Sequence, residues 1–277
     1  MNDHVNVITK FVIARTGEQD EQKRELHQNY AWIDNQFGRR AVRYHCSAGS
    51  GGAAVGLFLV PGMGGSMSGS RAKVLRSFAL THGLPFLSFD YTYLGSSVAE
   101  EHCEPWNLIS LWLDDARHML RLARGRRLVL VGFSIGVTVA LQLALGHPER
   151  VCGLVLCSPV FNITQILPPR HRRCPLIWII SMFLRCKLSV QHMRKFLRDA
   201  AQYKFTLRPD AVPVTCPVRI VQGMQDIFPY TNAIVLGEAL AASDVTVTLV
   251  KAADHYLLDH GSLDAVTRGV ACILATL

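Results

Sequence analysis

The stretch that decides the fold is Leu128-Val129-Leu130-Val131-Gly132-Phe133-Ser134-Ile135-Gly136-Val137-Thr138-Val139-Ala140. Branched apolar residues end at Gly-Phe-Ser-Ile-Gly and are followed by a helix-compatible run to position 145. This order predicts a buried strand, a sharp turn and a helix, with Ser134 at the tip of the turn. Gly132 and Gly136 flank the serine, where a side chain would crowd a strand that reverses directly into a helix. A hydroxyl beside the free N–H groups of a helix N-terminus can attack a carbonyl and have the resulting oxyanion stabilised.

The composition is that of a globular chain. With 277 residues, 49% of them hydrophobic and 18% charged, it fits one large α/β domain or one domain with an insertion. The eight cysteines include no pair at C-x-x-C spacing, which gives little support to a zinc site or a thioredoxin-type motif. Scattered single cysteines indicate free thiols in a reducing compartment.

No targeting or membrane-spanning segment is expected. The first residues lack a basic region followed by a long apolar run, so they do not resemble a secretory signal. Glu18, Asp20, Glu21 and Glu25 argue against an acid-poor transit peptide. The longest apolar run, 175–184, is half of the roughly 20 residues that cross a bilayer. The sequence therefore predicts a soluble, cytoplasmic protein.

The positive charge is concentrated in one segment. Residues 164–212 contain seven arginines, three lysines and two aspartates, so this segment carries the whole net charge of +8. Such a segment favours an anionic substrate, an anionic membrane surface or nucleic acid. The alternative is that the basic side chains bind no partner and only form the solvated surface of the helices that carry them.

Strands and helices alternate along most of the chain. Apolar runs predict strands at 5–14, 39–46, 54–60, 86–91, 128–131, 151–157, 216–223 and 245–250, and helical patterns predict helices at 70–82, 106–122, 137–145, 231–242 and 263–277. This alternation implies a parallel sheet with helices on both faces. The regular pattern lapses at about 162–212, which we interpret as an inserted helical cap.

A glycine-rich loop, Pro61-Gly62-Met63-Gly64-Gly65, follows the predicted strand 54–60. Because no Gly-Lys-Ser/Thr follows, it is not a P-loop, and its spacing misses the dinucleotide fingerprint. A loop that lends a backbone N–H to an oxyanion site fits better, with Met63 as the donor. The alternative is a plain tight turn.

A serine nucleophile needs a base, which is usually a histidine oriented by a carboxylate. Of the eleven histidines, His255 stands apart because it follows the predicted strand 245–250 and precedes the last helix. The alternative is a solvated loop histidine. For the carboxylate, Asp226 follows strand 216–223, although it could instead cap the next helix. Asp254 adjoins the histidine, and Asp90 follows a strand but precedes Ser134. The order Ser134, Asp226, His255 is typical of one large hydrolase fold.

In these residues and in their order, the chain resembles the serine α/β-hydrolases, and the resemblance extends over nearly its full length. More narrowly, it is similar to mitochondrial acyl-protein thioesterases that also act as acyl-glucuronide esterases. The matching stretches are Phe58-Leu59-Val60-Pro61-Gly62-Met63, Phe89-Asp90-Tyr91 with Gly95-Ser96-Ser97, Val131-Gly132-Phe133-Ser134-Ile135-Gly136, Cys216-Pro217-Val218-Arg219-Ile220-Val221-Gln222-Gly223-Met224-Gln225-Asp226 and Ala253-Asp254-His255.

The resemblance implies an α/β-hydrolase fold in one domain, 1–277, with a mostly parallel sheet and a cap at about 162–212. It implies Ser134 as nucleophile, Asp226 as acid and His255 as base. The N–H groups of Met63 and Ile135 would form the oxyanion hole. It also implies hydrolysis of carboxylic esters or thioesters without a metal or cofactor, and mitochondria as the alternative compartment.

The sequence thus predicts a serine hydrolase that acts on a small-molecule or protein-borne acyl group. Two alternatives remain: a lipase of the monoacylglycerol lipase type, and a non-hydrolytic receptor on the same scaffold. No nucleic-acid partner is expected, since the basic residues show no recognisable binding fold or interleaved aromatics. The basic cap is compatible with peripheral membrane contact, and nothing in the sequence specifies an oligomer.

Overall fold

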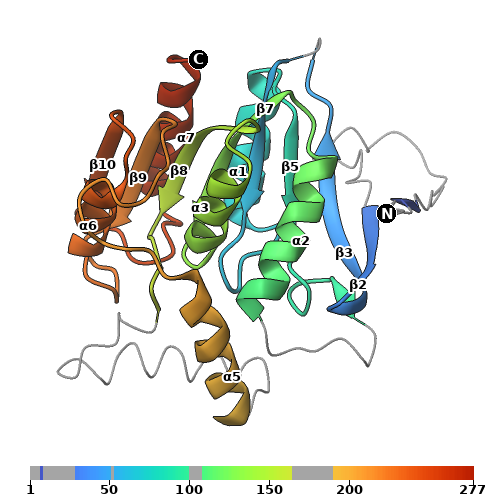
Figure 1. Cartoon of the computed structure of the whole chain (residues 1–277). Helices are drawn as coiled ribbons and strands as arrows, with labels where there is room; N and C mark the ends of the chain where they lie inside the picture. The colour runs from blue at the N-terminus through green and yellow to red at the C-terminus, as the bar shows by residue number, and fades with distance from the viewer. Residues whose placement is uncertain (1–6, 9–28, 51–52, 100–107, 164–189) are drawn as a thin grey trace.

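A ten-stranded sheet runs through the computed structural model, which describes residues 7–8, 29–50, 53–99, 108–163 and 190–277 (Figure 1). The strands are β1 (Val7–Ile8), β2 (Asn29–Asn35), β3 (Gly38–Ser47), β4 (Val55–Val60), β5 (Phe86–Phe89), β6 (Val98–Ala99), β7 (Arg127–Phe133), β8 (Val151–Cys157), β9 (Val218–Gly223) and β10 (Val245–Val250). Their order is β1-β2-β3-β5-β4-β7-β8-β9-β10, with β6 paired to β3.

All neighbours from β5 to β10 are parallel, whereas β1, β2, β3 and β6 pair antiparallel. The prediction of a mostly parallel sheet is therefore confirmed. The central strands β7 and β8 are buried on both faces apart from Arg127 at the start of β7. Continuous apolar runs are what a sheet covered on both sides requires.

Six α-helices lie within the described residues: α1 (Ser70–Thr81), α2 (Leu108–Leu122), α3 (Gly136–Gly146), α5 (Val190–Ala200), α6 (Thr231–Ala239) and α7 (His260–Leu274). The buried residues of α2, α3 and α6 belong to the core on one face of the sheet, in front in Figure 1. Those of α1 and α7 belong to the core on the other face. This arrangement confirms the expectation of helices on both faces.

Strand β2 was not predicted from the sequence. Its residues, Asn-Tyr-Ala-Trp-Ile-Asp-Asn, include several with low strand propensity. It forms a strand because it pairs along its whole length with β3, across a turn in which Gly38 adopts a φ of 88°. Ala31 and Ile33 are buried as a result. Of the strand predicted at 5–14, only the two residues of β1 lie within the described part.

The helix boundaries that differ from the prediction by three residues are in α6 and α7, and α7 ends at Leu274 rather than at 277. Helix α6 ends at Ala239 rather than at 242. Helix α7 begins at His260 rather than at 263, because the Asp259 carboxylate accepts a hydrogen bond from the Ser262 N–H at 2.9 Å and caps the helix there.

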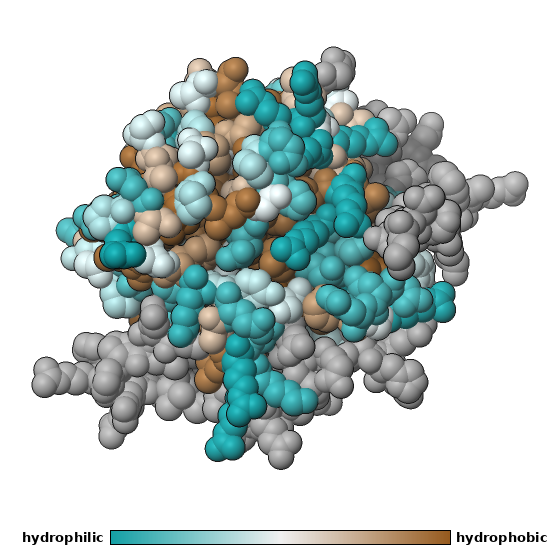
Figure 2. Space-filling view, in the orientation of Figure 1, coloured by the Kyte–Doolittle hydropathy of each residue, from teal (hydrophilic) through white to brown (hydrophobic). Residues whose placement is uncertain are grey.

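The predicted cap lies partly outside the described residues, at 164–189. The described remainder holds α5 and a short 3-10 helix, Ala201–Tyr203. Helix α5 is joined to the body of the domain by the buried Asp199, whose Oδ2 accepts hydrogen bonds from the N–H groups of Ile109 and Ser110 at 2.8 and 3.0 Å. Figure 2 shows α5 as a hydrophilic projection below the domain. The bounds of the insertion, about 162–212, stay a prediction.

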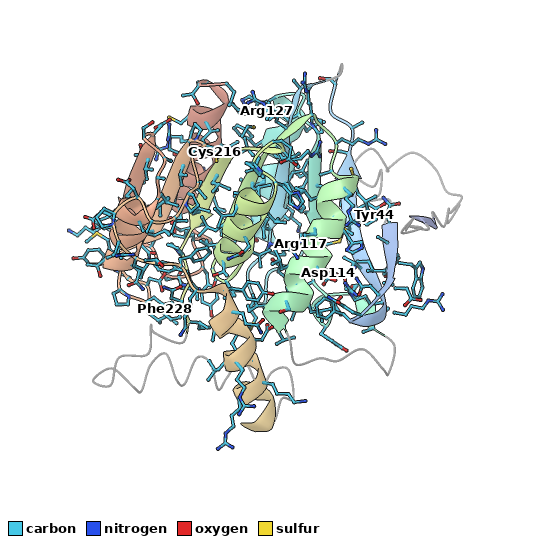
Figure 3. All side chains as sticks on the ribbon, viewed as in Figure 1. Tyr44, Asp114, Arg117, Arg127, Cys216 and Phe228 are labelled. Atoms are coloured by element: carbon cyan, nitrogen blue, oxygen red, sulfur yellow. The ribbon has the colours of Figure 1, made fainter. Side chains whose placement is uncertain are left out.

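The carboxyl ends of the parallel strands collect at one edge of the sheet. Figure 3 labels Arg127, at the start of β7, and Cys216, just before β9, at the upper edge of the view. Phe228, which follows the end of β9, lies at the lower edge. In sheets of this kind, the ligand crevice lies beyond the carboxyl ends of the strands.

Candidate active site

Ser134 occupies a strained turn between β7 and α3. Its φ of 54° lies in the left-handed region that non-glycine residues seldom adopt. The turn is held from both sides, because the Ser134 N–H donates to the Cys157 carbonyl at 2.9 Å and its carbonyl accepts from the N–H groups of Val137 and Val160. Such strain persists only where the surroundings impose it, and it is typical of functional sites.

The glycine after the turn is required by close packing. A Cβ at Gly136 would lie 2.4 Å from the Pro61 carbonyl oxygen and 2.6 Å from that of Val60. These atoms belong to the end of β4 and the loop that follows it. The absence of a side chain therefore lets the helix start directly against the neighbouring strand, which agrees with the crowding expected from the sequence.

Three side chains from separate strand ends meet at this turn. The Ser134 Oγ lies 2.9 Å from Nε2 of His255, and Nδ1 of His255 lies 3.0 and 2.9 Å from Oδ1 and Oδ2 of Asp226. The side chains of His255 and Asp226 are 5% and 1% exposed, so the contacts are shielded from water. With Nδ1–H donating to the carboxylate, Nε2 is free to accept the serine proton.

The Asp226 carboxylate has two further donors. The Phe228 N–H donates to Oδ1, and the side-chain amide of Gln222 donates to Oδ2, each at 2.9 Å. The alternative role of Asp226 as a helix cap is wrong, since α6 begins only at Thr231, after Tyr230. The Phe228 ring also packs edge-on against the imidazole of His255, with ring centroids 5.3 Å apart.

Gln222 was missed in the sequence. It is 1% exposed, and its Nε2 also donates to the Gly223 carbonyl at 2.8 Å. The available signal was an uncharged polar residue inside the otherwise apolar end of β9, Ile-Val-Gln-Gly. Buried polar groups are hydrogen-bonded, so such a residue predicts a polar partner nearby.

The loop after β4 lies directly against the nucleophile turn. A Cβ at Gly62 would be 2.7 Å from the Phe133 carbonyl and 3.0 Å from the Cβ of Ser134. Met63 is therefore next to a residue that touches the serine, and Ile135 precedes the first turn of α3. Within the part of the chain that the structure describes, the N–H groups of Met63 and Ile135 make no backbone hydrogen bond. Neither of the two predicted donors therefore has a backbone acceptor in the described chain; Ile135 adjoins Ser134, and Met63 adjoins Gly62, which packs against the serine.

The competing groups are engaged elsewhere. Asp254 turns away from the imidazole, because its Oδ1 accepts the N–H groups of Tyr256 and Leu257. The buried Asp90 accepts from the N–H groups of Met67 and Ser96. Cys157 is fully buried, and burial raises the pKa of its thiol far above its ordinary value, so it stays neutral.

No group of three or more histidine, cysteine, aspartate or glutamate side chains among the described residues is arranged to hold a metal ion. None of the described helices is both long and apolar enough to span a bilayer.

The sequence profile of the serine aminopeptidase S33 family matches residues 54–233, from the strand before the glycine-rich loop to α6. A rat (Rattus norvegicus) relative, the mitochondrial palmitoyl-protein thioesterase ABHD10, is 30% identical over 226 residues, which cover 75% of this chain and 71% of the relative. This chain belongs to the serine aminopeptidase S33 family. It is accordingly a serine hydrolase of the α/β-hydrolase class, as the resemblance implied.

Further comparisons agree with the family. The human (Homo sapiens) mitochondrial palmitoyl-protein thioesterase ABHD10 is 25% identical to this S33 hydrolase over 221 residues, covering 76% of this chain and 70% of the relative. The structure of mouse α/β-hydrolase domain-containing protein 10 superposes with a TM-score of 0.70 at 23% identity, covering 89% of this chain and 98% of that one. The latter shows the shared fold, and the α/β-hydrolase fold expected from the sequence is confirmed.

Proposed function

We propose that this protein hydrolyses acyl esters or thioesters through an acyl-enzyme on Ser134, with His255 as general base and Asp226 as the carboxylate that orients it. One observation carries the proposal: the continuous hydrogen-bonded chain from the Ser134 Oγ through the imidazole to the buried carboxylate. Its three members come from the ends of β7, β9 and β10, and 121 residues separate the serine from the histidine.

In the first half of the reaction, Ser134 Oγ attacks the acyl carbon while Nε2 of His255 takes its proton. The imidazolium that forms donates from Nδ1 to the Asp226 carboxylate, which stabilises the charge and holds the tautomer. The oxyanion on the tetrahedral carbon accepts hydrogen bonds from the N–H groups of Met63 and Ile135. The bond to the leaving thiol or alcohol then breaks, and His255 returns the proton to it.

In the second half, a water molecule gives its proton to Nε2 of His255 and attacks the acyl carbon. The same two N–H groups stabilise the second oxyanion, and collapse releases the carboxylic acid and restores the Ser134 hydroxyl. The positive end of α3 also favours negative charge at this point, because Ile135 immediately precedes its first turn.

For the substrate we propose a long-chain acyl thioester carried on a protein. Support comes from the rat and human relatives, which are named palmitoyl-protein thioesterases. The exposed basic residues of the cap, Arg194, Arg198, Lys204 and Arg208, provide electrostatic attraction for an acyl group borne on an anionic membrane surface. If the basic side chains only solvate the cap, KM for a vesicle-borne substrate will not depend on ionic strength.

For the compartment, the cytoplasm remains our proposal, and the relatives' names give mitochondria as the alternative. Support for a reducing compartment comes from the free cysteines among the described residues, at positions 46, 152, 157, 216 and 272. Fractionation of cells that express the full chain with a C-terminal fluorescent fusion decides between the two.

The proposal is tested by Ser134→Ala with a panel of p-nitrophenyl acyl esters, acyl thioesters, acyl glucuronides, monoacylglycerols and an amino-acid p-nitroanilide. We expect the wild-type protein to cleave thioesters or esters fastest and to react with a fluorophosphonate. Ser134→Ala should lose about five to six orders of magnitude in kcat, as in other serine hydrolases. Undiminished cleavage by Ser134→Ala would refute the assignment of the nucleophile, and fastest cleavage of monoacylglycerols would favour the lipase alternative.

A further inference from the structure

Arg71, in the first turn of α1, connects two segments that carry the proposed catalytic groups. Its Nε and Nη2 donate to the same acceptor, the Tyr256 carbonyl, at 2.9 and 2.6 Å. Tyr256 follows His255 directly, and 185 residues separate it from Arg71. Charged donors make stronger hydrogen bonds than neutral ones.

The same guanidinium also contacts the nucleophile turn. Its Cζ lies 4.8 Å from the centroid of the Phe133 ring, at a distance typical of a cation–π contact. Phe133 precedes Ser134 directly and is 2% exposed. The Arg71 side chain therefore contacts both Phe133, which precedes the proposed nucleophile, and Tyr256, which follows the proposed base.

The space around Arg71 shows why such a connection matters. A pocket of about 210 Å³ lies between the glycine-rich loop and the histidine loop, and its lining includes Gly62, Gly64, Phe133, Tyr256 and Leu258 as well as Arg71 itself. Tyr256 and Leu258 are 47% and 51% exposed, and of these three consecutive residues only Leu257 is buried in the core, so the side chains on either side of it are held little by burial.

The backbone of Tyr256 is held by hydrogen bonds at both ends. Its N–H donates to the Asp254 carboxylate at 2.8 Å, and its carbonyl accepts the two bonds from Arg71. The first interaction shapes the turn locally. Of these two interactions, only the second reaches a distant part of the fold, and it adds to the contacts that His255 makes with Ser134 and Asp226.

We propose that Arg71 is a positioning residue, which holds the turn carrying His255 against the nucleophile turn so that Nε2 stays within hydrogen-bonding distance of the Ser134 Oγ. This inference rests on the proposed function. A displacement of about 1 Å at a catalytic group is enough to cost about 100-fold in rate, so the loss of this connection is expected to be visible in catalysis.

The test compares Arg71→Met, which keeps an apolar chain over Phe133 but removes all donors, with Arg71→Lys and with Lys73→Met. Lys73 is exposed on the same helix, so Lys73→Met removes one positive charge from α1 without touching either loop. For Arg71→Met we expect kcat and the rate of fluorophosphonate labelling to fall about 10- to 100-fold with KM nearly unchanged. Arg71→Lys should recover most of the rate, and Lys73→Met should match the wild type.

A second measurement separates positioning from folding. In Arg71→Ala the vacated site adjoins the pocket, so free guanidinium at about 20 mM, too dilute to unfold the protein, should restore part of the lost labelling rate. The same concentration should leave the wild type and Lys73→Met unchanged, and sodium chloride at equal ionic strength should not substitute for it.

The outcomes distinguish the two proposals. If the wild type reacts with the fluorophosphonate and folded Arg71→Met reacts as fast, Arg71 does not position the base and this inference fails alone. If Arg71→Met and Arg71→Ala are both unfolded, the role is structural and the inference is equally overturned. If the wild type does not react at all, the proposed function itself fails.

Discussion

Replacing Asp226 by asparagine is the sharpest perturbation of the site. Three donors converge on the carboxylate: the Phe228 N–H on Oδ1, the Gln222 amide on Oδ2, and Nδ1 of His255 close to both oxygens. The Phe228 N–H belongs to the backbone, so an asparagine must keep its oxygen at the Oδ1 position. Its NH₂ group then takes the Oδ2 position, where it faces the Gln222 amide and the imidazole.

This exchange inverts the tautomer of the base. An NH₂ group donates to Nδ1, so the imidazole carries its proton on Nε2 and donates to the Ser134 Oγ instead of accepting from it. The histidine can then no longer take the serine proton, although the geometry is nearly unchanged. The corresponding substitution in a serine protease lowers kcat about 10⁴-fold, and we expect a similar fall here, about 5.5 kcal/mol in activation free energy.

The assay is steady-state hydrolysis of a p-nitrophenyl ester together with the rate of fluorophosphonate labelling. Asp254→Asn is the matched control, because Asp254 adjoins His255 but uses its Oδ1 only as an acceptor for the N–H groups of Tyr256 and Leu257. An asparagine keeps that acceptor, so the rate should stay within about twofold of the wild type. The reasoning is wrong if Asp226→Asn keeps more than about a tenth of kcat, or if both variants lose activity equally.

Three further predictions concern the packing at the nucleophile turn, the support of Asp226 and the anchor of α5. Gly136→Ala should lower the free energy of unfolding by about 3 kcal/mol, because its Cβ would lie 2.4 Å from the Pro61 carbonyl oxygen. In the control Gly146→Ala, at the other end of α3, the new Cβ meets nothing within 4 Å, so the protein should be equally stable or more stable by up to about 1 kcal/mol. Thermal unfolding compares the two variants, and equal effects would contradict the packing argument. Gln222→Leu should lower kcat about tenfold with an unchanged KM, since it removes a donor to the Asp226 carboxylate, and an unaltered kcat would show that the amide does not orient it. Asp199→Ala should lower the free energy of unfolding by about 1–3 kcal/mol and speed proteolysis within α5, because two N–H groups of α2 lose their acceptor. If α5 of the variant resists proteolysis as well as that of the wild type, Asp199 does not anchor α5 to the domain.

Much of the fold follows from local patterns. The strand, turn and helix around Ser134 are visible in the sequence because a buried parallel strand is continuously apolar and a sharp turn needs small neighbours. The same holds for β8, whose observed bounds equal the predicted ones. Strand β2 shows where such patterns fail, since its polar residues become a strand only through pairing with β3.

The candidate site divides in the same way. Ser134, Asp226 and His255 were named from their places after predicted strands, and the structure brings these three side chains together. Gln222 and Arg71 were not named. Gln222 contacts the Asp226 carboxylate, and Arg71 contacts the carbonyl of Tyr256 in a distant loop. The residues next to them in the sequence do not indicate these partners.

The sequence by itself determined the class of fold, the position of the nucleophile turn and the order of the three candidate groups. These depend on side-chain size, hydrophobic period and turn sterics, which act between residues close together in the chain. Only the tertiary structure decided that the second carboxylate, Asp254, faces away from the imidazole, that Gln222 donates to Asp226, and that an arginine of α1 donates to the Tyr256 carbonyl. Such contacts join residues far apart in the chain, so they exist only after the strands have paired and the helices have packed on the sheet.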